Sequence, residues 1–154
     1  MLFRVTLDLH QIGDILYPGN FAEPYLQFRP GGPYPPEPWF TNLLIEIALE
    51  SARKAARPDA PSRLHSIFSC ETIDEVRIFK NKYRENNGYI FGIEPENNNI
   101  STFRGNSTAI STPVGPTPYI EYTSDWARDY WTKEPDGMVE VLIGGPARVI
   151  SGPL

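Results

Sequence analysis

The sequence is short of the residues that build covalently bridged or metal-held folds. Its 154 residues include one cysteine, Cys70, so no disulfide can form within the chain. Two histidines are too few to define a metal site by their spacing, and no glycine-rich phosphate loop is present. We therefore expect a single domain over residues 1–154 that is held together by a hydrophobic core.

Long apolar runs are also absent. The most apolar stretch, Leu43 to Leu49, is interrupted by Glu46 and is far shorter than the ~20 residues that span a bilayer. The first residues, Met-Leu-Phe-Arg-Val-Thr, lack the apolar core of a secretory signal. We therefore expect no membrane segment and a cytoplasmic location.

Positive charge is scarce. Fourteen basic residues face nineteen acidic ones, which gives a net charge of −5, so the molecule as a whole repels a phosphate backbone. We expect no nonspecific binding of nucleic acid, although this overall charge is compatible with a local basic groove.

Proline and glycine, by contrast, are abundant and occur in blocks. Between Tyr17 and Trp39, prolines alternate with aromatic residues, which predicts an ordered loop rather than a disordered one. Two interpretations are open for this loop. It is either a passive wrap over the core or a lid whose rings stack on a planar ligand.

Hydrophobic patterning predicts an α+β fold organised around one strand and one helix. Leu64 to Ser69 alternates as a strand that carries polar and apolar groups on both faces. Thr72 and Glu75 then form a capping box for a helix over 72–83. A helix that directly follows a hydroxyl-bearing strand can hold a few side chains still in front of a ligand.

The other predicted elements surround this unit. Residues 97–118, which are rich in polar residues, glycine and proline, are expected to be mostly surface loop. Caps at Thr41 and Ser124 predict helices over 41–56 and 124–131, and alternation predicts strands over Leu2 to Leu7, Tyr89 to Ile93, Met138 to Ile143 and Ala147 to Ile150.

Two charged residues stand within predicted apolar strands. Arg4 lies either on an exposed sheet edge or in a cleft, where it would be a fixed cation for a phosphate or a ribose. Glu140 lies either at a sheet edge in water or in the interior, where a carboxylate needs a partner and is retained for chemistry.

Several short motifs resemble the ADP-ribosyltransferase-like superfamily. Gly13 to Gly19, Tyr89 to Pro95 and Pro146 to Ile150 are similar to segments of rifampin ADP-ribosyltransferases. The strand from Met138 to Ile143 is similar to one of the DNA-modifying toxins of the same superfamily. The resemblance implies two small, mainly antiparallel sheets around an NAD cleft, with flanking helices.

The superfamily carries an arginine or histidine on its first strand, a hydroxyl residue on a second and a glutamate on a late strand. These positions correspond to Arg4, Ser66 and Glu140, which the resemblance implies as catalytic residues. The aromatic residue expected on the second strand aligns with Ile67. Met138 stands where arginine-modifying toxins have a glutamate or glutamine, so their signature is absent.

The residue types fit cleavage of NAD. A fixed carboxylate such as Glu140 stabilises the ribosyl oxocarbenium ion that forms as nicotinamide leaves, and Ser66 or Ser69 would orient this carboxylate. The nicotinamide ring needs an aromatic ring to stack on, which Tyr17, Phe68 or Phe21 would provide. The expected NAD-binding residues are Arg4, Thr6, Tyr17, Ser66, Phe68 and Ser69.

Two function classes therefore remain. The first is NAD-dependent ADP-ribosyl transfer, or NAD glycohydrolysis, with NAD as cofactor and an unknown protein, nucleobase or small molecule as acceptor. The second is a catalytically inert domain of the same fold that acts as a binding or interaction protein. Nicotinamide release from NAD distinguishes the two.

Overall fold

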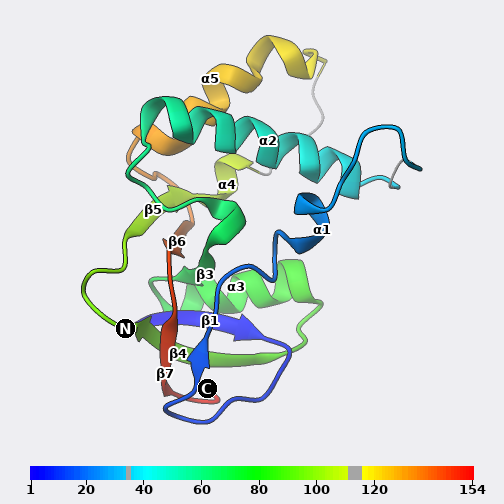
Figure 1. Cartoon of the computed structure of the whole chain (residues 1–154). Helices are drawn as coiled ribbons and strands as arrows, with labels where there is room; N and C mark the ends of the chain where they lie inside the picture. The colour runs from blue at the N-terminus through cyan, green and yellow to red at the C-terminus, as the bar shows by residue number, and fades with distance from the viewer. Residues whose placement is uncertain (34–35, 111–115) are drawn as a thin grey trace.

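The computed structural model describes residues 1–33, 36–110 and 116–154 and has an α+β fold (Figure 1). Its described strands form one antiparallel sheet in the order β2-β7-β4-β1-β3-β6-β5. The strands are β1 (Leu2–Thr6), β2 (Ile15–Leu16), β3 (Ile67–Cys70), β4 (Tyr89–Pro95), β5 (Thr102–Asn106), β6 (Val139–Ile143) and β7 (Ala147–Ser151).

Helices cover two parts of this sheet. The long helices α2 and α5 pack against each other, and their core residues meet those of β5 and β6, whereas α3 packs on β1 and β3 (Figure 1). In the parts of the chain that the structure describes, no helix is both long and apolar enough to cross a membrane. The helices are α1 (Glu23–Leu26), α2 (Trp39–Ala56), the 3-10 turn η1 (Arg63–His65), α3 (Ile73–Arg84), α4 (Ser107–Ile110) and α5 (Tyr119–Thr132).

The sheet consists of two halves with a narrow join. Strands β1 and β3 meet at one Cα pair, Phe3 opposite Cys70, whereas β1 and β4 are paired along the whole of β1. Ile67 and Ile143 of one half share a buried core with Phe91 of the other half. The two expected sheets are therefore not confirmed, because the halves β2-β7-β4-β1 and β3-β6-β5 are continuous through the join.

The central helix is confirmed. Thr72 caps α3 by accepting a hydrogen bond from the Glu75 backbone N–H, and the Glu75 carboxylate accepts one from the Thr72 backbone N–H. Strands β1, β4, β6 and β7 also lie where alternation predicted strands. These elements are set by short-range patterns, which a sequence displays directly.

The predicted strand from Leu64 to Ser69 is wrong in its first half. The chain makes the turn η1 before β3 begins at Ile67. The Ser62 hydroxyl accepts a hydrogen bond from the Leu64 N–H, and the Ser66 hydroxyl donates one to the Ser62 carbonyl. These local side-chain bonds close the turn and compete with strand formation.

Both long helices begin earlier than predicted. Pro38 rather than Thr41 precedes α2, and Pro118 rather than Ser124 precedes α5. A proline is well tolerated at a helix start because the missing N–H would have no partner there.

The surface loop predicted over 97–118 is also wrong in part. It contains β5 and α4, and every residue of β5 is paired with β6. This pairing joins residues far apart in the sequence, so no local pattern of β5 predicts it. Residues 111–115 of this loop lie outside the described residues.

Candidate functional site

Glu140 occupies the interior of the sheet. Strand β6 lies between β3 and β5, and the Glu140 backbone is opposite Cys70 on one side and Gly105 on the other. The side chain is buried. The interpretation of Glu140 as an edge residue in water is therefore excluded, and its carboxylate requires partners in the interior.

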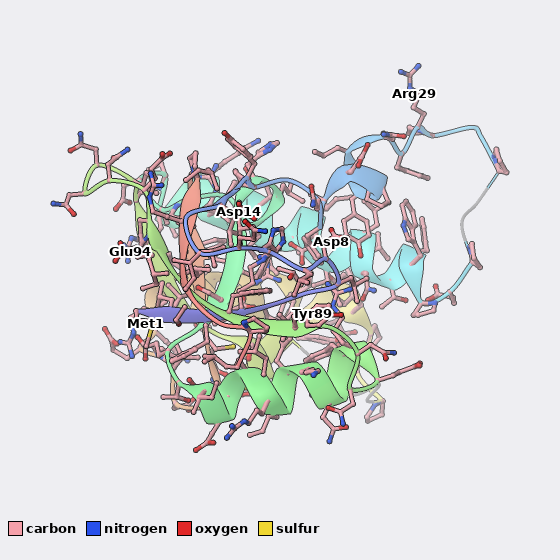
Figure 2. The ribbon with its side chains drawn as sticks, turned by 90° about the horizontal axis from the view of Figure 1, so that it is seen from below. Met1, Asp8, Asp14, Arg29, Tyr89 and Glu94 are labelled. Atoms are coloured by element: carbon pink, nitrogen blue, oxygen red, sulfur yellow. The ribbon has the colours of Figure 1, made fainter. Side chains whose placement is uncertain are left out.

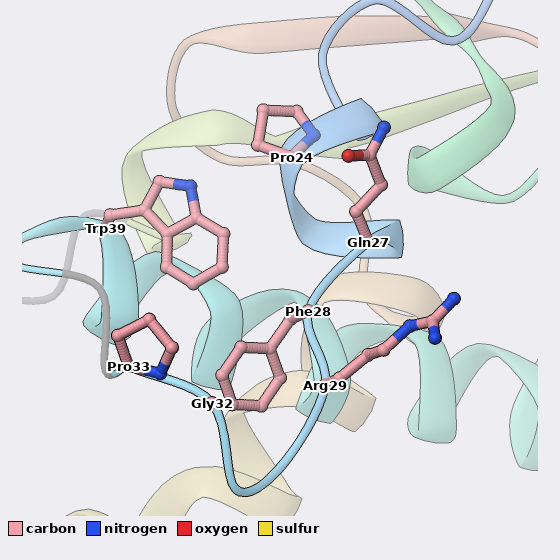
Figure 3. A pocket seen from close by; sticks show the side chains of 7 residues that line it. All are labelled: Pro24, Gln27, Phe28, Arg29, Gly32, Pro33 and Trp39. Atoms are coloured by element: carbon pink, nitrogen blue, oxygen red, sulfur yellow. The ribbon is translucent and has the colours of Figure 1, made fainter.

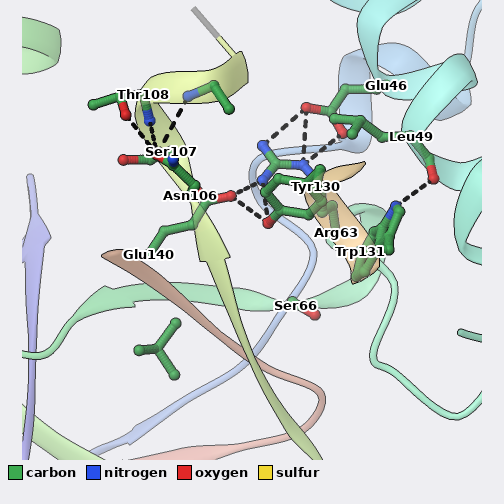
Figure 4. Close-up of polar contacts among 12 residues, drawn as sticks. Glu46, Leu49, Arg63, Ser66, Asn106, Ser107, Thr108, Tyr130, Trp131 and Glu140 are labelled. Carbon is green, nitrogen blue, oxygen red and sulfur yellow. Dashed lines mark hydrogen bonds and ion pairs between the residues drawn. The ribbon is translucent and has the colours of Figure 1, made fainter. Parts of the chain in front are cut away.

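Arg63 provides the main partner and is itself buried (Figure 4). Its Nη1 donates to Oε1 of Glu140, while its Nε and Nη2 donate to the Glu46 carboxylate of α2 at 3.0 and 3.1 Å. One guanidinium thus bridges two carboxylates from separate elements. Burial lowers the pKa of Arg63, but Glu140 and Glu46 raise it more, so this group is a permanent cation.

Tyr130 of α5 completes this group of four side chains, which we call the Arg63 cluster: Glu46, Arg63, Tyr130 and Glu140. The Tyr130 hydroxyl accepts from Nη1 of Arg63 at 3.0 Å and donates to Oε1 of Glu140 at 2.5 Å. Burial and the adjacent Glu140 hold the pKa of Tyr130 well above its usual value. The hydroxyl is therefore a donor at neutral pH.

Gly105 explains how α5 brings Tyr130 so close to the sheet. A Cβ at Gly105 would lie 2.4 Å from the Tyr130 ring, which is too close for any side chain. The glycine therefore leaves the space that the tyrosine ring fills beside Glu140.

The two oxygens of Glu140 have different surroundings. Oε1 accepts from both Arg63 and Tyr130, whereas Oε2 accepts no hydrogen bond from the residues that the structure describes. The Glu140 side chain keeps 12% of its exposure. Oε1 is thus held by two donors, whereas Oε2 has none among the described residues.

An aromatic ring borders the Arg63 cluster. The guanidinium of Arg63 lies over the Phe68 ring, 4.9 Å from its centroid, and Phe21 contacts the same ring edge-on at 4.8 Å. Phe68 lies on the same face of β3 as Cys70, and hence on the face of Glu140. Ile67, where the resemblance expects an aromatic residue, is part of the core between the sheet halves.

Arg4 lies inside the sheet, because β1 has neighbours on both sides, so an exposed edge is excluded. Its Nη1 donates to the Phe68 carbonyl at 2.9 Å, and no carboxylate among the described residues pairs with it. Burial, with a smaller effect from Arg84, lowers the pKa of Arg4 to about 10.

Arg4 does not lie beside Glu140, although the resemblance implies that both residues belong to one catalytic site. Phe3 is opposite Cys70, and Cys70 is opposite Glu140, so these three side chains lie on one face of the sheet. Arg4 follows Phe3 and therefore lies on the other face. Arg63 takes the position next to the carboxylate.

The predicted hydroxyl residues bind backbone carbonyls instead of Glu140. Ser66 donates to Ser62 at 2.6 Å, Ser69 to Val141 at 3.0 Å and Thr6 to Asp8 at 2.6 Å. The expectation that Ser66 or Ser69 orients Glu140 is therefore wrong. Ser69 is next to Cys70 on β3, so its side chain lies on the face of the sheet opposite to that of Glu140.

The aromatic segment that follows Tyr17 is ordered by contacts between its rings, but it is not wholly a loop, because it contains the short helix α1. Phe21 contacts Tyr25, Tyr25 contacts Trp39, and Trp39 contacts Phe28, with centroid distances of 5.5, 5.3 and 6.0 Å. Tyr17 itself is 69% exposed. Residues 34–35 of this segment are outside the described residues.

Sequence reasoning missed three members of the Arg63 cluster. Glu46 carried a usable signal, because a carboxylate within the apolar stretch from Leu43 to Leu49 raises the same question as Glu140. Tyr130 lies in the predicted helix over 124–131, but a helical pattern does not show that its hydroxyl binds a carboxylate. Arg63 precedes β3 in a polar turn and has no local signal.

The profile of a family described as a protein of unknown function, DUF2441, matches residues 38–152. The chain belongs to this family. All four residues of the Arg63 cluster lie within the part of the chain that matches DUF2441, whereas Arg4, Thr6 and Tyr17 precede it. No curated protein matches the chain.

Proposed function

We propose that the chain cleaves the bond between nicotinamide and ribose in NAD and transfers ADP-ribose to an acceptor or to water. The observation that carries this proposal is the asymmetric Glu140 carboxylate, with Oε1 held by Arg63 and Tyr130 and Oε2 without a hydrogen bond among the described residues. A carboxylate oriented in this way is suited to stabilise a positive charge that develops only during the reaction.

The reaction balances without any further reagent. As the bond between ribose C1 and the nicotinamide nitrogen breaks, its electron pair stays with nicotinamide, and the ribose becomes an oxocarbenium ion. Oε2 of Glu140 accepts a hydrogen bond from a ribose hydroxyl and stabilises this cation. The acceptor, which is a protein, a nucleobase, a small molecule or water, bonds to C1 and loses a proton.

Strand adjacency supports the resemblance to ADP-ribosyltransferases. Strands β1, β3 and β6 are neighbours in the sheet, and they correspond to the first, second and late strands that carry the functional residues of that superfamily. The ADP-ribosyltransferase-like fold is part of this proposal. In it, Arg63 replaces Arg4 beside the carboxylate, and Arg4 is a partly buried cation available to a phosphate oxygen.

Measuring nicotinamide release from NAD tests the proposal. We expect Glu140→Gln to slow release by about a hundredfold, because the amide cannot stabilise the cation as a carboxylate does. The variant should remain folded, since Glu46 still neutralises Arg63. Glu121→Gln, which makes the same change at an exposed position of α5, should release nicotinamide at the wild-type rate.

A second function is favoured by one observation. Arg63 already pairs with both Glu46 and Glu140, so the cluster also ties α2 to β6 and could serve stability alone. In that case the chain is an inert domain of this fold that binds a partner. Wild-type protein that releases no nicotinamide, or a Glu140→Gln variant as fast as wild type, would leave only this function.

A further inference from the structure

A hollow of about 320 Å³ lies between α1 and the start of α2 (Figure 3). Its volume is within the range of sites for small ligands. Its lining shares no residue with the Arg63 cluster. The lining contains two aromatic rings, a cation and an amide, but no carboxylate. Its lining includes Pro24, Gln27, Phe28, Arg29, Pro33 and Trp39.

Two aromatic rings form the apolar part of this hollow. Phe28 and Trp39 are partly buried, and their ring centroids lie 6.0 Å apart with their planes tilted by 53°. Tyr25 supports the Trp39 ring at 5.3 Å, and Phe40 supports the Phe28 ring at 6.3 Å. The two rings that line the hollow are thus packed against neighbouring rings, and aromatic faces stack on any nucleobase.

A cation and an amide lie at the rim. Figure 3 shows Gln27 and Arg29 on the side of the hollow opposite Trp39, and Figure 2 shows the Arg29 side chain extending away from the body of the protein. Among the described residues, no carboxylate or hydrogen-bond acceptor pairs with Arg29. The Gln27 amide makes one long hydrogen bond, to Glu23 at 3.5 Å.

We propose that this hollow binds one nucleotide unit, with the base against Phe28 and Trp39 and the phosphate at Arg29. An unpaired guanidinium has five donors suited to a phosphate, and its long side chain can reach over the hollow. The site goes beyond the cleavage of NAD and does not depend on it. The adenylate half of NAD and a nucleotide of an acceptor both present this chemistry.

Isothermal titration calorimetry with three probes separates the two halves of the site. We expect AMP to bind more tightly than adenosine, which lacks the phosphate, or ribose 5-phosphate, which lacks the base. Phe28→Leu should weaken AMP and adenosine about tenfold. Arg29→Gln should weaken AMP and ribose 5-phosphate but leave adenosine unchanged. Arg77→Gln, an exposed change on α3, is the matched control and should bind AMP as wild type does.

Titration with NAD identifies the source of the nucleotide. If Phe28→Leu weakens NAD as much as AMP, the hollow holds the adenylate half of NAD. If it weakens AMP alone, the nucleotide belongs to a separate ligand. The proposal is overturned if AMP gives no saturable heat, or if Phe28→Leu and Arg29→Gln both bind AMP as the control does. Glu140→Gln should bind AMP normally, so loss of catalysis and loss of this site are distinguishable.

Discussion

At the scale of single residues, the Arg63 cluster holds two negative charges and one positive charge, because two carboxylates surround one buried guanidinium. Removing charges from water costs several kcal/mol for each ion, and only close pairing offsets that cost. Glu46 and Glu140 share the hydrogen bonds of Arg63, so neither carboxylate has another cation among the partners that the structure describes. Arg63 is therefore the residue on which the other charges depend.

We accordingly expect Arg63→Met to lower the free energy of unfolding by about 3–5 kcal/mol, because it leaves two buried carboxylates without a cation. Glu46→Gln should cost less, since Arg63 keeps Glu140 as its partner. Urea denaturation of each variant gives these values. Arg77→Met on the exposed face of α3 is the control, and an equal loss for Arg77→Met and Arg63→Met would contradict the central position of Arg63.

The same residues show what the sequence could and could not predict of the site. The importance of Glu140 was predictable, because the sequence alone shows a carboxylate within an apolar strand. A buried carboxylate needs a partner in the interior. Its partner was not predictable. Arg63 reaches Glu140 only because a turn, a helix and a strand meet in space. Arg4 was an equally conspicuous charge in a strand, but the register at Phe3 places it on the other face.

At the scale of elements, α3 illustrates how a local signal acquires a long-range role. Oε2 of Glu75 accepts from the Thr72 backbone N–H, and Oε1 accepts from the Val139 backbone N–H at 3.2 Å. The capping carboxylate therefore joins the start of α3 to the strand residue that precedes Glu140. The helix boundary was predictable from Thr72 and Glu75 alone, whereas this connection to β6 was not.

Because the Glu75 carboxylate both caps α3 and binds β6, its removal should affect stability more than removal of the cap alone. Thr72→Ala should lower the free energy of unfolding by about 1 kcal/mol, the usual value of a helix cap. Glu75→Ala should cost more, because it also leaves the Val139 N–H without its acceptor. Asp74→Ala, in the same exposed first turn, should have a smaller effect than either. If thermal and urea denaturation ranked Thr72→Ala above Glu75→Ala, the link to β6 would contribute nothing.

At the scale of the whole molecule, the part of the chain that matches the family does not contain the whole sheet. Residues 38–152 include β3 to β7, but β1 lies in the middle of the sheet and joins β4 to β3. The segment that precedes the matched part therefore connects the two halves. The α+β class was predictable from alternating and helical patterns, but a single sheet with a one-pair join depends on pairing between distant strands.

The core also makes the stability of the molecule sensitive to alkaline pH. Burial, and to a smaller extent Glu75 and Glu140, raise the pKa of the Cys70 thiol from 9.0 to about 12. An unfolded chain loses this proton near pH 9 while the folded chain keeps it, so the unfolded state binds fewer protons above that pH. The free energy of unfolding then falls as pH rises, and Tyr130, whose pKa is also raised, adds to the fall at higher pH.

We expect a loss of about 1 kcal/mol from Cys70 between about pH 8 and about pH 10, because the unfolded chain loses the thiol proton in this range and the folded chain keeps it. Urea denaturation under reducing conditions across this range measures it. Cys70→Ala removes the titrating group, so its free energy of unfolding should fall less steeply with pH even if the variant is less stable throughout. Parallel pH dependence in the two proteins would assign the alkaline loss to other groups and show that the thiol ionises equally well in the folded and unfolded chain.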